Sequence, residues 1–259
     1  MAIVTTSEKE KYLEDGVIFL RNFLGPDEVK ATQDRVQYYV DNIIPNIPEN
    51  ERVYEDEGIA LRNMFHMHLY DEYFNKFGNM AKLKEAVFEL EGWACELHYV
   101  ESFMKPKNVG SEVPMHQDEV FLSIARPQFV TAWFPMDPVD TRNGTLRFIL
   151  GSHKWGAIPH ETTTIPGSQY VTANADALKQ LPSLAAELMP GDIALFGCRL
   201  LHYSLPNTSD RPRRILGVGL HGPDAGVLQR EEDWERILES MTLDEMRPKG
   251  AEDCPERKP

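Results

Sequence analysis

The N-terminal part of the chain has the pattern of amphipathic helices. The run Thr5-Thr6-Ser7-Glu8, a hydroxyl cap followed by acidic residues, predicts the start of a first helix that should end near Asp15-Gly16. Apolar residues then recur at roughly helical spacing over 25–45, where Pro45 should end the helix. Over 71–90 they recur at three- and four-residue steps, which predicts one or two further helices. These helices are expected to buttress a sheet from outside.

From Trp93 onward the pattern changes to that of β-strands. Tyr99, Glu101 and Phe103 share one face of the first strand, although alternation alone does not show which face looks inward. The Asn143-Gly144 pair is typical of a hairpin turn. Further strands are expected at 17–20, 131–134, 145–150, 192–196 and 214–220. The pattern therefore predicts a mainly β fold with flanking helices.

Three segments lack a clear period. Residues 41–60 are polar and contain prolines, which predicts a loop that could face a substrate. Residues 151–191 are long and proline-containing, so they are either a lid that sets substrate specificity or a surface excursion. Residues 230–259 are highly charged, which predicts a solvated helix and a frayed tail.

The length and charge of the chain narrow its class. A chain of 259 residues suits one elaborated domain, 1–259, with a core at about 93–222 and a helical N-terminal buttress at 5–90. Its 18 prolines and 17 glycines suit a turn-rich β fold. A formal net charge of -14 opposes binding to nucleic acid or to an anionic membrane. Neither partner is expected.

The cysteines and the N-terminus suggest a cytoplasmic protein. The chain has 3 cysteines, far apart and without a Cys-X-X-Cys pair, so neither a disulfide framework nor a thiolate zinc site is predicted. No basic region followed by an apolar run opens the sequence, and no apolar stretch is long enough to span a membrane. We therefore expect a soluble, unexported protein in a reducing cytoplasm.

The candidate chemistry centres on His116 and Asp118. In an extended strand two residues that are two apart project to the same side, so an imidazole and a carboxylate would converge on one point. With His202 from a distant strand they would form the facial 2-His-1-carboxylate triad that holds Fe(II) and leaves three positions open. A His-X-Asp tripeptide alone is more often a simple hydrogen-bonded pair. For a second pair, His66 and His68, a role in the pocket wall for one of them is favoured over a role as metal ligands.

The wider set of motifs resembles the phytanoyl-CoA dioxygenase family. The resemblance covers roughly residues 10–222 and depends on the order and spacing of several pieces. It implies an Fe(II)- and 2-oxoglutarate-dependent oxygenase on a double-stranded β-helix, or jelly-roll, core of the cupin type. The pieces are His116-Gln117-Asp118, the runs 131–137 and 143–153, Gly191-Asp192, His202-Tyr203-Ser204 and the run 207–213.

The same resemblance implies which residues hold the co-substrate. Arg213 follows His202 at the family's spacing and would bind the distal carboxylate of 2-oxoglutarate through two charge-assisted hydrogen bonds. Arg211 and Arg214 are the competing choices. Further co-substrate contacts are implied for Ser204, Trp133, Tyr99 and Thr145, of which Trp133 could equally be a core aromatic.

The implied reaction is oxidation, most simply hydroxylation, of an unactivated C–H bond, with release of succinate and carbon dioxide from 2-oxoglutarate and dioxygen. Asp118 favours hydroxylation over halogenation, because related halogenases have a small residue there. Desaturation, epimerisation and cyclisation remain open. The substrate is expected to be a free small molecule, such as an intermediate of secondary metabolism, and the oligomeric state is not determined.

Two other classes of protein compete with this interpretation. A non-catalytic cupin-like metal-binding protein would keep the jelly roll and the triad but would not need Arg213. A zinc hydrolase would use Cys198 or Glu119 near the metal, although a free cysteine is more often a buried core residue.

Overall fold

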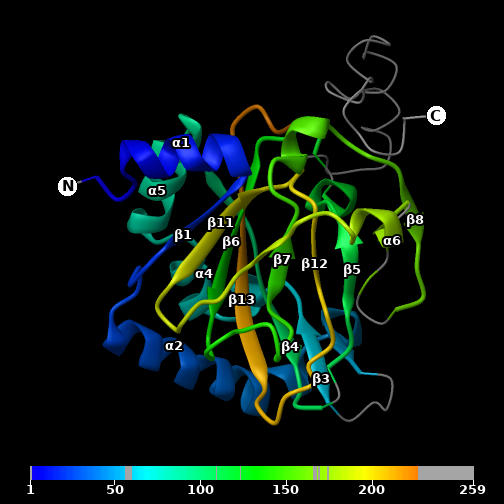
Figure 1. The fold of residues 1–259 in the computed structure, drawn as a ribbon. Helices are drawn as coiled ribbons and strands as arrows, with labels where there is room; N and C mark the ends of the chain where they lie inside the picture. Colours follow the sequence, from blue (N-terminus) through cyan, green and yellow to red (C-terminus); the bar gives the residue numbers. More distant parts are fainter. Residues whose placement is uncertain are drawn as a thin grey trace.

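Two antiparallel sheets face each other in the computed structural model, which describes residues 2–55, 60–108, 110–122, 124–165, 168, 170–173 and 175–226. The larger sheet has seven strands in the order β1-β11-β6-β13-β4-β3-β2, and the smaller has four in the order β10-β7-β12-β5 (Figure 1). A third, two-stranded sheet, β8-β9, is not hydrogen-bonded to either of them. The strands of the larger sheet are β1 (Val17–Leu20), β2 (Arg52–Tyr54), β3 (Leu61–Met64), β4 (Glu96–Lys105), β6 (Phe129–Pro135), β11 (Ile193–Gly197) and β13 (Arg213–His221).

The outer face of the larger sheet is covered by helices (Figure 1). They bury apolar side chains such as Tyr12, Val36 and Leu83 against Val218 and Leu220 of β13. The first helix begins with a capping box, in which Thr5 and Glu8 bond each other's backbone N–H groups, in agreement with the predicted hydroxyl cap. The helices are α1 (Thr6–Asp15), α2 (Pro26–Tyr38), α3 (Met67–Tyr70), α4 (Glu72–Gly78) and α5 (Ala81–Glu91).

The smaller sheet is buried on both faces. Its inner face contributes Leu146 and Phe148 to the core between the sheets, where they meet Trp133 and Phe196 of the larger sheet. Its outer face is covered by short elements of the segment 151–191, which pack over Met115 and Tyr203. The sheet consists of β5 (Val113–His116), β7 (Leu146–Phe148), β10 (Leu184–Ala185) and β12 (His202–Ser204), and the cover includes β8 (His160–Thr162), β9 (Tyr170–Thr172) and α6 (Ala175–Leu178).

This architecture confirms the predicted mainly β fold with flanking helices, and it corrects three details. The region 41–60 was expected to be a loop but contains β2, an edge strand too short to show an alternating pattern. The N-terminal buttress is accordingly not only helical, because β1, β2 and β3 all join the larger sheet. Helix α2 ends at Tyr38, before Pro45, and the chain continues as π and 3₁₀ turns to Asn46. Pro45 lies in the first positions of that 3₁₀ turn, where its missing N–H leaves no helical hydrogen bond unmade.

A further correction concerns Asn143-Gly144, which was predicted to turn a hairpin. The chain does turn there, with Gly144 at a φ of 76°. However, the strand before the turn, β6, belongs to the larger sheet, and the strand after it, β7, belongs to the smaller. The turn therefore connects the two sheets, and a short sequence signal cannot show which partner each strand will choose.

Two further predictions meet the limits of the described chain. The charged segment 230–259 lies outside the described residues. The assignment of 1–259 to one domain stays a prediction. Among the helices of the described part, none is long and apolar enough to cross a membrane.

Candidate metal centre

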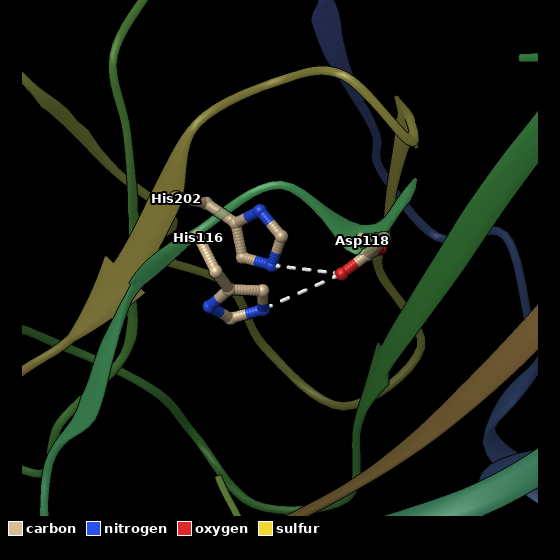
Figure 2. Close-up of side chains that lie close together, drawn as sticks. All are labelled: His116, Asp118 and His202. Atoms are coloured by element: carbon tan, nitrogen blue, oxygen red, sulfur yellow. Dashed lines mark ion pairs between the residues drawn. The ribbon is translucent and has the colours of Figure 1, made fainter. Parts of the chain in front are cut away.

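Three side chains from two strands and one turn converge between the sheets. The Nε2 atoms of His116 and His202 each lie 3.4 Å from Oδ1 of Asp118 (Figure 2). Their potential ligand atoms are all within 4.8 Å of one another, and in the described part of the chain this is the group able to hold a metal ion. The structure thus brings together the three residues that the sequence proposed as the triad.

The local backbone explains this convergence. His116 ends β5 and pairs directly with His202 of β12, so both imidazoles project from the same face of the smaller sheet. Asp118 was expected on the same strand as His116, but it is the first residue of a 3₁₀ turn. Gln117 between them is extended, with φ −106° and ψ 136°, and this preserves the two-residue alternation that directs both side chains to one side.

Backbone carbonyl groups set the orientation of both imidazoles. Nδ1 of His116 donates to the carbonyl of Pro114 at 2.7 Å, and Nδ1 of His202 donates to that of Leu200 at 2.9 Å. A proton held on Nδ1 leaves the Nε2 lone pair free, and Nε2 is the atom that faces Asp118. Both rings are therefore fixed in the tautomer that binds a metal.

The protonation states also suit a metal site. Burial lowers the pKa of His202 to about 4, so its imidazole is neutral near pH 7. Burial opposes ionisation of Asp118, but His202, His116 and the Thr131 hydroxyl together bring its pKa to about 2. Metal ligands must be deprotonated, and at neutral pH these two groups are.

Thr131 supports Asp118 from the opposite sheet, a role that the sequence analysis missed. Its hydroxyl donates to Oδ2 of Asp118 at 2.6 Å and leaves Oδ1 directed at the two histidines. Thr131 shares a strand face with Trp133 by simple alternation. The sequence could have indicated Thr131, because Trp133, two residues later, was already a predicted co-substrate contact.

We expect Thr131→Val to weaken Fe(II) binding by roughly 10- to 100-fold, the usual effect of losing an outer partner of a ligand. Valine keeps the shape of threonine but cannot hold the carboxylate. An anaerobic Fe(II) titration measures the change. Thr145→Val is the matched control, because the Thr145 hydroxyl donates to the carbonyl of Ala186 and does not reach Asp118. Equal losses in the two variants would contradict a specific role for Thr131.

Gln117 ties the triad to the cover of the smaller sheet. Its buried amide donates to the carbonyls of Gly156 and Arg199, and its side-chain oxygen accepts from the backbone N–H of Ile158. Its own backbone N–H donates to Nε2 of His160. The residue between the two ligands is therefore held from both sides, which fixes the turn that presents Asp118.

Replacing Gln117 with leucine should lower the free energy of unfolding by roughly 2–4 kcal/mol, because it leaves buried backbone groups without partners. Denaturant unfolding measures this effect. The exposed Gln37 of α2 provides the control, and Gln37→Leu should stay within about 0.5 kcal/mol of the parent protein. A similar small change for Gln117→Leu would show that these hydrogen bonds do not hold the turn.

The triad opens into a cavity of about 80 Å³. Of the predicted co-substrate residues, Arg213, Ser204, Trp133 and Tyr99 line it. The guanidinium carbon of Arg213 lies 5.8 Å from the centre of the Trp133 ring. Thr145 is buried outside the lining, so its implied role remains a prediction without a contact to the cavity.

The three candidate arginines differ in their partners. Arg211 pairs with Asp140 at 2.7 Å, and Arg214 forms a two-pronged pair with Asp137 at 2.7 and 3.0 Å. Arg213 is 2% exposed, its Nε has no hydrogen-bond partner among the described residues, and it forms no ion pair with any of them. Burial lowers its pKa to about 9. It is the arginine of the three that is left for a ligand.

The competing ligand candidates lie elsewhere. His66 pairs with Glu51 at 2.9 Å, and Nδ1 of His68 accepts from the backbone N–H of Val100. Neither lines the cavity, so the pocket-wall role suggested for one of them is not what their positions favour. Cys198 is buried with its thiol toward the carbonyl of Pro127, and Glu119 is paired with Arg199.

Comparison with known proteins identifies the family. The family model described as Phytanoyl-CoA dioxygenase (PhyH) matches residues 12–215. The chain belongs to the phytanoyl-CoA dioxygenase family. A phytanoyl-CoA dioxygenase domain-containing protein 1 homolog of Dictyostelium discoideum is 26% identical over 240 residues, which is 90% of this chain and 80% of the relative. A probable alpha-ketoglutarate-dependent hypophosphite dioxygenase of Stutzerimonas stutzeri is 24% identical, covering 85% of this chain and 80% of the relative.

Solved structures confirm the fold. EctD from S. alaskensis, determined with 2-oxoglutarate and 5-hydroxyectoine, matches with a TM-score of 0.76 at 20% identity, covering 88% of this chain and 79% of that one. The carbocyclase SnoK from nogalamycin biosynthesis matches with a TM-score of 0.73 at 17% identity, covering 95% and 92%. As a member of the phytanoyl-CoA dioxygenase family, the protein is a 2-oxoglutarate-dependent oxygenase with His116, Asp118 and His202 as its candidate iron site.

Proposed function

We propose that this protein uses Fe(II), 2-oxoglutarate and dioxygen to hydroxylate an unactivated C–H bond of a small molecule. One observation carries the proposal. A facial His-Asp-His triad lines the same cavity as a buried arginine that has no hydrogen bond or ion pair with any described residue. A protein that only stored or sensed a metal would have no need for the second feature.

The donor set fits Fe(II). Two neutral imidazoles and one carboxylate on one side of a point are the ligands of non-haem iron oxygenases, and they leave the opposite side open. The bound iron would supply the activation of dioxygen. His116 and His202 would present Nε2 to it, while Thr131 would hold the second oxygen of Asp118 away.

The remaining polar groups fit 2-oxoglutarate. The Arg213 guanidinium could form a charge-assisted pair with the distal carboxylate, which would repay the cost of burying an unpaired cation. The Ser204 hydroxyl is fully buried and lacks a partner in the described structure, and it lines the cavity two residues after His202. Trp133 lies beside Arg213 and would close that side against water. These three residues would fix the orientation of the keto acid.

We further propose that the protein acts as a single domain in a reducing cytoplasm. The two described cysteines, Cys95 and Cys198, support this placement because both are buried as free thiols. A role in secondary metabolism is consistent with a curated relative, the 1-deoxypentalenic acid 11-beta-hydroxylase of Streptomyces arenae, which is 26% identical over 216 residues.

Succinate release tests the proposed reaction. Protein reconstituted anaerobically with Fe(II) would be given 2-oxoglutarate, oxygen and each member of a panel of small molecules. We expect one compound to stimulate succinate formation and to gain one oxygen atom, as seen by mass spectrometry. Succinate formed with a product that lacks two hydrogens, or that is isomeric with the substrate, would replace hydroxylation with desaturation or epimerisation.

A further inference from the structure

Glu101 is an acidic residue on β4, a strand that contributes side chains to the cavity lining. Glu101 lies on β4 between Tyr99 and Phe103, two residues from each, so the three share one strand face. Tyr99 and Phe103 both line the cavity, which shows that this face looks inward. Glu101 is partly exposed and forms no hydrogen bond or ion pair with any residue that the structure describes.

Other acidic side chains around the site have partners. Glu119 pairs with Arg199, Asp137 with Arg214, and Glu55 with Arg62. Asp118 belongs to the triad. A partly buried carboxylate costs free energy unless it is paired, so an inward carboxyl without a partner suggests one that arrives with a ligand.

The neighbouring strand leaves room for such a ligand. Glu101 pairs in register with Gly217 of β13, and Gly217 pairs on its other side with Trp133. A Cβ added to Gly217 would meet no neighbour closer than 3.6 Å, the Phe103 ring, so there is room above the glycine for one carbon atom in ordinary van der Waals contact. Glu101 and Trp133 therefore lie on either side of Gly217, and two strand spacings, or about 10 Å, separate them.

Residues of β6, β13 and β4 that pair with one another form rows across the larger sheet. Glu101 and Arg213 lie in different rows, so the space beside Glu101 is separate from the proposed co-substrate position. Thr131, which holds Asp118, pairs with Gly219 in the row next to Glu101. Arg213 lies two rows to the other side, paired with Lys105. A keto acid reaching from the triad to Arg213 would lie along Trp133. The space on the β4 side of Gly217, next to Glu101, would remain for the substrate.

The charges and rings around Glu101 favour a cation. Burial, with the nearby carboxylates of Asp118 and Glu51, raises the pKa of Glu101 to about 8. An anionic group would meet the same negative surroundings. A positive group would restore the charge of Glu101 and would lie beside the aromatic faces of Tyr99 and Phe103, which attract cations. Iron does not reverse this preference, because the positive charges of Fe(II) and Arg213 are balanced by dianionic 2-oxoglutarate and Asp118, which leaves the metal centre without net positive charge.

We propose that Glu101 is the substrate-recognition residue of this site and that the substrate carries a cationic nitrogen, such as a protonated amine, a guanidinium or a quaternary ammonium. The inference rests on the proposed function, since it assigns the substrate class of the same cavity. It places the C–H bond to be oxidised between the cationic group and the triad.

Calorimetric titration of the protein loaded with Fe(II) and 2-oxoglutarate under nitrogen tests the inference with matched probes. The pairs are choline with its uncharged tert-butyl isostere, and hexylamine with hexanol. We expect each cation to bind at least about tenfold more tightly than its neutral partner, and Glu101→Gln to remove this preference. Glu96→Gln is the control, because Glu96 is an exposed glutamate on the same strand.

Cations that bind no better than their neutral partners, including pairs without measurable binding, would overturn the inference, as would a preference that survives in Glu101→Gln. A thermal melt of each variant shows that it is folded. The charge-transfer absorption of iron with 2-oxoglutarate, recorded in the same samples, distinguishes a failure of the Glu101 assignment from a failure of the proposed function. If that absorption is present without a cation preference, only the assignment of Glu101 fails; if it is absent, the proposed function itself fails.

Discussion

Arg213→Met is expected to weaken 2-oxoglutarate binding by on the order of 30- to 4,000-fold, because removing one partner of a buried charge pair costs about 2–5 kcal/mol and each ~1.4 kcal/mol is tenfold. The same change should raise the free energy of unfolding of the ligand-free protein by roughly 1–3 kcal/mol, the cost of a buried polar group left unsatisfied. Arg213 is 2% exposed and has no ion pair among the described residues, so methionine removes a charge that only a ligand can pair. Calorimetric titration and denaturant unfolding measure the two effects.

Arg214→Met is the matched control, because the two arginines are consecutive and face opposite ways. Arg214 is paired with Asp137, so its loss should destabilise the protein and leave 2-oxoglutarate affinity unchanged. The two variants should therefore change stability in opposite directions. If Arg213→Met destabilised the protein and bound 2-oxoglutarate normally, Arg213 would be a structural residue and the co-substrate position would be wrong.

Asp118→Asn is expected to lower Fe(II) affinity by at least about 100-fold, the upper end of what losing even an outer partner of a ligand costs. Asparagine keeps the size of the side chain and can still accept the Thr131 hydrogen bond. It loses the negative charge that balances the metal, and the neutral imidazoles cannot replace that charge. Competition with a metal chelator under nitrogen measures the affinity.

Glu119→Gln controls for the loss of one negative charge near the centre. Glu119 follows Asp118 directly, but its carboxylate forms a two-pronged pair with Arg199 at 2.7 and 2.9 Å. We expect this variant to keep the Fe(II) affinity of the parent protein. Equal losses in the two variants would mean that overall charge, rather than coordination by Asp118, controls iron binding.

The sequence predicted the triad because its local geometry is encoded within a few residues. Two-residue spacing brings His116 and Asp118 to one side whether the second is in a strand or in a turn, as long as Gln117 is extended. His202 required a pairing between distant strands, and the family's motif order supplied it. The structure then showed a direct His116–His202 pair, which periodicity alone could not have given.

The parts that sequence analysis missed depend on contacts between elements. The Asn143-Gly144 turn was visible, but which sheet each flanking strand joins is decided by the packing of whole sheets. Thr131 supports Asp118 across the cavity, 13 residues away in the chain. The segment 151–191 was expected to be a lid or a surface excursion. It packs over Met115 and Tyr203 on the outer face of the smaller sheet, and no described residue of it lines the cavity, which does not favour the lid.

The choice among Arg211, Arg213 and Arg214 as the ligand of 2-oxoglutarate depended on knowing their side-chain partners. Spacing favoured Arg213 over Arg211 and Arg214 but did not exclude them. The structure distinguishes them by their partners, because Asp140 and Asp137 occupy the two competitors. The inward face of β4 was likewise undecided until the cavity lining placed Tyr99 and Phe103, and with them Glu101.

If the protein is the proposed oxygenase, one cavity binds iron and 2-oxoglutarate together. Anaerobic absorption spectroscopy, in which Fe(II) and then 2-oxoglutarate are added to the protein, tests this joint binding. We expect a metal-to-ligand charge-transfer band that appears only with both present and that is lost in Asp118→Asn and in Arg213→Met at moderate 2-oxoglutarate concentration. A protein that binds Fe(II) tightly but never develops the band would contradict the oxygenase account and would support a metal-binding role instead.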